Sequence, residues 1–245
     1  MMNYGVYLYG IFPSPGPENL TVEGMDKQSV FSQVLEGFTF LYSEAKQTKY
    51  LTSRRNLLCH EKVLEDAMAA GFYNLLPLRF GLVVKDWDAV ESQLIKPYKN
   101  QLISLFEHLD GKREVSIKIF WDSTRELQDL LEENQTLRQQ RDSLIGKSLS
   151  MDETIAIGQR IEVALENRKR GIIQEFRDAL NLLAFEVIES DTLMEKMIYN
   201  AAYLIPWDSE EKFSVIVEEI DGKFGDRLRI RYNNFTAPYT FAQLN

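Results

Sequence analysis

The 245-residue sequence has few of the residues that build metal sites and nucleophilic catalytic sites. It contains one cysteine and two histidines, with no Cys-x-x-Cys or His-x-x-x-His motif. Cys59 and His60 are neighbours, and adjacent side chains diverge on a helix, so they can share neither a metal ion nor a proton. A serine hydrolase has no support either, because no Gly-x-Ser-x-Gly motif is present. We therefore expect no catalytic function, no metal and no cofactor.

Other absences bear on location and partners. No apolar run approaches the roughly 20 residues that a membrane-spanning helix needs. Pro13, Pro15 and Pro17 interrupt the pattern of a signal peptide, and a single cysteine is typical of a reducing compartment. Basic residues are fewer than acidic ones, 28 against 37, and no strong basic cluster is evident. The composition predicts a cytoplasmic protein that binds neither nucleic acid nor membrane.

Apolar residues are nevertheless plentiful. Hydrophobic residues make up 44% of the chain and aromatic residues 11%, enough to fill a globular core. His60, Val63, Leu64 and Ala67 recur at the spacing of one helix face. In the first part of the chain the patterns predict strands at 3–11, 38–43 and 77–84, a helix at 55–70, and a second helix that is capped by Asp86 and either kinked or split in two at Pro97.

A second cycle of strands and helices begins near residue 113. We expect strands at 114–121, 197–205 and 226–232, and helices at 123–145, 152–188 and 208–221. The predicted fold class is α+β, with two domains, 1–110 and 111–245. Each is expected to be a modified ferredoxin-like sheet with helices, and the second to carry a long helical hairpin at about 123–188 and a C-terminal tail.

Several charged residues stand out from this framework. Arg227, Arg229 and Arg231 alternate on a predicted strand, so they would share one face. That face would either bind a carboxylate-rich partner or a phosphate, or be a solvated face neutralised by nearby acids such as Glu218 and Glu219. Arg79 lies between apolar residues, and we expect it to be buried in a structural ion pair with Glu61 or Glu65.

The C-terminal tail is aromatic and contains a proline. Tyr239 and Phe241 flank Thr240 just after Pro238. Such tails dock into grooves, either on the chain's own N-terminal domain or on a partner, and we favour a structural role for these two residues on the N-terminal domain.

Five short motifs span most of the chain: Tyr-x-Tyr-Gly-Ile at 7–11, His-x-x-Val-x-Glu at 60–65, Pro-Leu-Arg-Phe-Gly at 77–81, Asn-x-Ala-Tyr-Leu at 200–204 and Pro-Tyr-x-Phe at 238–241. Their order resembles that of the gas vesicle protein L/F family. Many members of that family carry a Gly-Pro pair before the last motif, where this chain has Asn233–Thr236.

The resemblance implies a two-domain, non-catalytic minor component of gas vesicles, which are hollow protein organelles in the cytoplasm. Its expected partners are the major shell protein and other accessory proteins of the vesicle. We expect it to assist nucleation by binding the hydrophobic shell subunit and preventing its aggregation. The candidate contact surfaces are the aromatic strand with Tyr7 and Tyr9, the apolar stripe of the helical hairpin, and the three arginines. The alternative is a ferredoxin-like regulator that binds a small anionic ligand.

Overall fold

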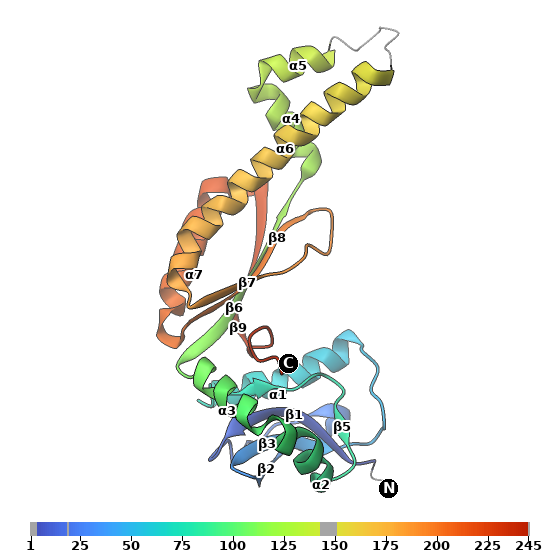
Figure 1. Cartoon of the computed structure of the whole chain (residues 1–245), viewed down its shortest axis with the longest axis vertical. Helices are drawn as coiled ribbons and strands as arrows, with labels where there is room; N and C mark the ends of the chain where they lie inside the picture. The colour runs from blue at the N-terminus through green and yellow to red at the C-terminus, as the bar shows by residue number, and fades with distance from the viewer. Residues whose placement is uncertain (1–3, 19, 143–150, 245) are drawn as a thin grey trace. The chain divides into compact units, whose positions relative to one another are not determined.

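The structure, a computed structural model, describes residues 4–18, 20–142 and 151–244. The chain divides into two compact units (Figure 1). Unit 1 comprises residues 1–115, 204–207 and 234–245, and unit 2 comprises 116–203 and 208–233. The division lies slightly beyond the expected boundary near Asp110, and the C-terminal tail belongs to unit 1.

Unit 1 is built on an antiparallel sheet with the strand order β2-β3-β1-β4, in which β5 also pairs with β1. A two-residue turn, Glu36-Gly37, joins β2 to β3, and both residues have positive φ, as a type I′ hairpin requires. The strands are β1 (Val6–Pro13), β2 (Phe31–Leu35), β3 (Phe38–Glu44), β4 (Leu76–Pro77) and β5 (Val83–Val84).

Helices cover both faces of this sheet. On one face lies α1 (Arg54–Ala69), which is capped by Ser53 and buries the predicted face of His60, Val63, Leu64 and Ala67. Against the other face, Phe106 stacks on Phe38 and Trp87 meets Tyr42. Asp86 caps this second helical segment as predicted, and a π-helical turn precedes Pro97. The segment consists of α2 (Trp87–Val90), the π turn (Glu91–Ile95) and α3 (Lys96–Leu109).

Unit 2 has the ferredoxin-like order of elements. Its sheet has the strand order β7-β8-β6-β9, and one helical segment follows β6 while another follows β8. Phe213 of α7 packs against Tyr203 and Tyr232, so α7 covers the face to which those tyrosines point. The elements are β6 (Lys112–Trp121), α4 (Ser123–Glu133), α5 (Gln135–Asp142), α6 (Met151–Leu180), β7 (Glu186–Glu189), β8 (Met197–Pro206), α7 (Glu210–Phe224) and β9 (Leu228–Thr236).

The predicted hairpin is a helical arm, formed by α4, α5 and α6 (Figure 1). Its first helix breaks at Asn134, whose side chain accepts a hydrogen bond from the N–H of Leu137 at 3.0 Å. The second ends at Leu180, so the expected helix to residue 188 is wrong in its last part, where β7 forms. The expected loop around 146–150, like Leu144, lies outside the described residues.

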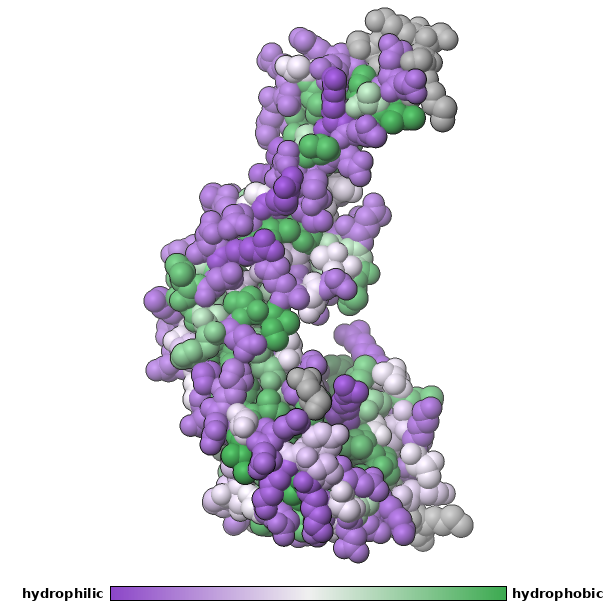
Figure 2. Space-filling model, viewed as in Figure 1, coloured by the Kyte–Doolittle hydropathy of each residue, from purple (hydrophilic) through white to green (hydrophobic). Residues whose placement is uncertain are grey.

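The apolar stripe of the arm is used within the arm itself. Leu130, Leu131 and Leu137 are buried and pack with Ile161 and Leu165 of α6. This corrects the expectation that the stripe is a contact surface. The face of the arm seen in Figure 2 is mainly hydrophilic, with scattered apolar residues.

The two sheets share a strand order but differ in their first connection. In unit 2 the connection between its first two strands, β6 and β7, is helical. In unit 1 the described residues between β1 and β2, 14–18 and 20–30, contain a 3-10 turn at Met25–Lys27 and no longer helix. Prolines at 15 and 17 disfavour a helix that begins directly after β1, since proline interrupts a helix. The β2 side of the first sheet is therefore flanked by an irregular segment.

Candidate functional site

The two tyrosines expected to contact a partner are instead core residues. The side chains of Tyr7 and Tyr9 are fully buried because β1 lies between β3 on one side and β4 and β5 on the other. The Tyr7 hydroxyl lies 2.9 Å from His60 Nδ1, and the Tyr9 hydroxyl 2.8 Å from Ser43 Oγ. A partner cannot reach either ring, so this prediction is corrected.

Burial sets the protonation of this cluster. It raises the pKa of Tyr7 and raises that of Tyr9 to about 12, while it lowers the pKa of His60 to about 4. All three side chains are neutral at pH 7. His60 Nε2 lies 3.0 Å from the Leu78 carbonyl oxygen, so the imidazole connects α1 to β1 and to the segment after β4. The cluster is part of the core of unit 1.

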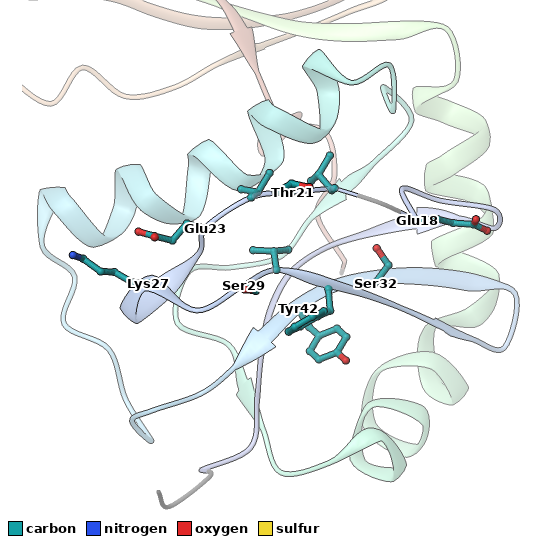
Figure 3. Close-up of a pocket in the computed structure, with 11 residues that line it drawn as sticks. Glu18, Thr21, Glu23, Lys27, Ser29, Ser32 and Tyr42 are labelled. Atoms are coloured by element: carbon teal, nitrogen blue, oxygen red, sulfur yellow. The ribbon is translucent and has the colours of Figure 1, made fainter.

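A pocket of about 680 Å³ lies beside β2 (Figure 3). One wall is the irregular segment that replaces a helix between β1 and β2, and the other is β2 with its neighbour on β3. Glu23 and Lys27 lie toward one end of the pocket and Glu18 toward the other. The remaining lining residues are Leu20, Val22, Val30, Phe31 and Tyr42, with the hydroxyl groups of Thr21, Ser29 and Ser32.

The pocket adjoins the open edge of the first sheet. Val30, the residue before β2, donates its backbone N–H to the carbonyl oxygen of Val22 at 3.0 Å. The N–H of Val30 therefore points away from β3. Backbone direction alternates along a strand, so the N–H groups of Ser32 and Val34 also point outward. Within residues 4–18, 20–142 and 151–244, neither N–H has a backbone partner. The Ser32 hydroxyl donates to the carbonyl oxygen of Pro17, so the segment before β2 approaches the edge at Ser32, while outward backbone groups of this kind are what an added strand pairs with.

Apolar side chains accompany these backbone groups. Phe31 is 51% exposed and Val34 is 53% exposed. They point to opposite faces of β2, and the Phe31 ring lies 5.8 Å from that of Tyr42. An open edge with exposed apolar side chains is unusual, because edge strands are ordinarily protected by charge or proline.

The strand β2 was not predicted from the sequence. The signal was present: a Glu-Gly pair at 36–37 between the apolar residues Val34, Leu35 and Phe38 is a short-hairpin pattern. Ser32 and Gln33 made the strand hard to recognise, because two polar residues lower the apolar content of a five-residue strand.

The three alternating arginines are not equivalent. Arg227 lies in a 3-10 turn before β9, and its guanidinium donates to both carboxylate oxygens of Glu126 at 3.0 and 2.8 Å. Arg229 and Arg231 lie on β9, exposed, with their guanidinium carbons 4.8 and 5.2 Å from the centre of the Phe120 ring. Glu126 was not predicted as a partner of these arginines. The expected row is thus one ion-paired residue and one exposed pair.

Glu126 is the centre of a buried charge cluster in unit 2. Besides Arg227, it accepts a hydrogen bond from Nε of Arg168 at 2.6 Å, and Arg168 also binds the more exposed Glu133. Burial raises the pKa of Glu126, but the two guanidiniums outweigh this, so its pKa is lowered overall. The cluster connects α4, α6 and the turn before β9.

The prediction for Arg79 is wrong. Its side chain is exposed, and it forms no ion pair with Glu61, Glu65 or any other described residue. The reason is that residues 77–84 are not one strand: β4 ends at Pro77, and a turn with positive φ at Gly81 leads to β5. Arg79 lies in that connection, where its charge remains in water.

The C-terminal tail docks on unit 1. Glu114, which is buried, accepts hydrogen bonds from the N–H of Thr240 at 2.8 Å and from its hydroxyl at 2.7 Å. Phe241 is buried, and Tyr239 packs against the core that contains Tyr7 and Leu64.

The described residues contain no group of three or more His, Cys, Asp and Glu side chains placed to hold a metal ion. Within the same residues no helix is both long and apolar enough to cross a membrane.

Comparison with known proteins identifies the family. The profile described as gas vesicle synthesis protein GvpL/GvpF matches residues 5–243. Gas vesicle protein F of Nostoc sp. and that of Dolichospermum flosaquae are each 64% identical to this chain over 244 residues. Each match covers 100% of this chain and 100% of the relative. The crystal structures of GvpF from Anabaena sp. and Microcystis aeruginosa are 61% and 62% identical to it, each with a TM-score of 0.86. They match 98% of this chain and 97% and 100% of their own. The chain belongs to the gas vesicle synthesis protein GvpL/GvpF family.

Proposed function

We propose that this gas vesicle protein is a non-catalytic assembly component, which binds the small hydrophobic shell subunit during nucleation and prevents its aggregation. The family assignment supports a role as a gas vesicle component. A polymerising hydrophobic subunit must be shielded from water until it joins the shell, since exposed apolar surface aggregates. Other accessory proteins of the vesicle are proposed as further partners.

The observation that carries this proposal is the open edge of β2. The outward N–H groups of Ser32 and Val34 supply hydrogen-bond donors for an added strand, and Phe31 and Val34 supply apolar contacts on its two faces. The adjacent pocket is large enough to take side chains of that strand. Strand addition of this kind draws affinity from the backbone and selectivity from neighbouring pockets.

The test is co-expression of this chain with the shell subunit of the same vesicle, followed by capture of the chain and measurement of the subunit that stays soluble with it. Val34→Lys puts a charge on the edge, which is how natural sheets block strand addition. Val215→Lys is the matched control, because Val215 is similarly exposed at 47% but lies on α7.

We expect the wild type and Val215→Lys to retain the subunit in solution, and Val34→Lys to lose about tenfold or more of the captured amount, since strand pairing and apolar contact are lost together. Equal capture by Val34→Lys and wild type would overturn the assignment of this edge. Absence of the subunit from all captures would overturn the proposed function itself.

A further inference from the structure

A second exposed feature lies on unit 2, on the face of its sheet that α7 does not cover. Tyr232 of β9 points to α7, where it stacks with Phe213 at 5.9 Å. Side chains alternate along a strand, so Arg229 and Arg231 point to the opposite face. Phe120 of β6 lies on that same face, since both guanidiniums stack on its ring.

The two arginines are held in place but carry no compensating charge. Each guanidinium rests on the Phe120 ring, at 4.8 and 5.2 Å, which restricts its motion while leaving its donors open to water. Both side chains are exposed, and neither has an ion pair with a described residue. Such preorganisation lowers the entropy cost of binding an anion.

The acidic residues nearby are already engaged. A pocket of about 340 Å³ next to the ring contains Arg229, Lys196, Asp122 and Asp226. Asp226 forms a bidentate ion pair with Arg125 at 2.9 and 3.0 Å, and Asp122 accepts the N–H groups at the start of α4. Lys196 has no ion pair among the described residues. The surface is therefore locally basic although the chain carries a net charge of −9.

We propose that this surface, defined by Phe120, Lys196, Arg229 and Arg231, binds an extended acidic segment of a partner protein, with carboxylates on alternate residues. β9 is at the edge of its sheet, and the backbone of residues 229–231 makes no hydrogen bond beyond the sheet within the described residues. A segment that runs alongside β9 places carboxylates two residues apart opposite arginines two residues apart.

The experiment uses the full chain and a fluorescein-labelled peptide of alternating glutamate and threonine, with binding followed by fluorescence anisotropy at low salt. The test variant is Arg229→Gln/Arg231→Gln. The matched control, Arg160→Gln/Lys212→Gln, removes the same charge from exposed positions on α6 and α7. We expect the test variant to bind about tenfold or more weakly than wild type, and the control to bind like wild type.

A reversed variant keeps the proposal testable if the first variant is unstable. Arg229→Glu/Arg231→Glu is expected not to bind the glutamate peptide and to bind a peptide of alternating lysine and threonine. An unfolded protein would not show this selectivity. Equal binding of the glutamate peptide by wild type and Arg229→Gln/Arg231→Gln would overturn the proposal. Tighter binding of a single-stranded oligonucleotide than of the peptide would also overturn it.

Discussion

Arg227 donates two hydrogen bonds to the carboxylate of Glu126, a residue 101 positions earlier in the sequence. The Glu126 side chain is only 1% exposed, and it is the meeting point of two guanidiniums. This buried cluster connects the helical arm to the strand β9 that carries the exposed arginine pair.

Removing the buried charge at the centre of this cluster is expected to be costly. Glu126→Gln leaves Arg168 and Arg227 with a neutral partner, and breaking a buried ion pair typically costs about 3–5 kcal/mol. Urea unfolding measures the loss. Glu133→Gln is the control, because Glu133 is 65% exposed and its pair with Arg168 is expected to contribute less than about 1 kcal/mol. Equal losses in the two variants would contradict the central role of Glu126.

Acid is expected to destabilise the fold through His60. Its pKa is about 4 in the folded protein and about 6.5 when exposed, so the unfolded chain binds more protons between these values. The stabilisation from neutral, buried His60 is present above pH 6.5 and is lost as the pH falls toward 4. The loss amounts to about 3 kcal/mol. Unfolding free energies of the wild type and His60→Gln, measured from pH 7 to 4, should converge over this interval, and a constant difference would contradict the assignment.

Gly24 is expected to tolerate no side chain. A Cβ atom at this position would lie 2.0 Å from the Tyr9 hydroxyl, which also accepts the N–H of Met25. Gly24→Ala should destabilise unit 1 by about 1–3 kcal/mol through overpacking. Gly222→Ala on α7 is the control, because nothing lies within 4 Å of its added Cβ, and alanine favours helix. In thermal melts, the melting temperature of Gly24→Ala should fall below that of the wild type, and that of Gly222→Ala should equal or exceed it.

The docking of the C-terminal tail on unit 1 is expected to depend on Glu114. Replacing it with alanine removes the acceptor of two Thr240 hydrogen bonds, so the tail should open more often. Amide hydrogen exchange at Thr240 and Phe241 should accelerate about tenfold or more in Glu114→Ala. Glu107→Ala, an exposed change on α3, should leave it unaltered. Unchanged exchange in both variants would show that apolar packing alone holds the tail.

Elements with a strong local pattern were predictable from the sequence. The alternation in β6 and the apolar face of α1 are properties of neighbouring residues, so periodicity revealed them. The separation of β4 from β5 was not predicted, because the turn between them depends on Gly81 taking positive φ within an otherwise apolar stretch.

The candidate sites were harder to predict for a related reason. Arg227 pairs with Glu126 across 101 positions, and no local spacing indicates such a partner. Tyr7 and Tyr9 are of a residue type that is common at protein interfaces, but β1 pairs with strands on both sides and both side chains are buried. The open edge of β2 follows from sheet order, which short-range patterns do not specify.

The most direct test of the central claim is amide hydrogen exchange of this chain with and without the shell subunit. The account predicts that the outward N–H groups of Ser32 and Val34 exchange rapidly in the free protein and become strongly protected when the subunit binds. Binding of the subunit with no added protection at Ser32 and Val34 would contradict the claim that β2 receives it.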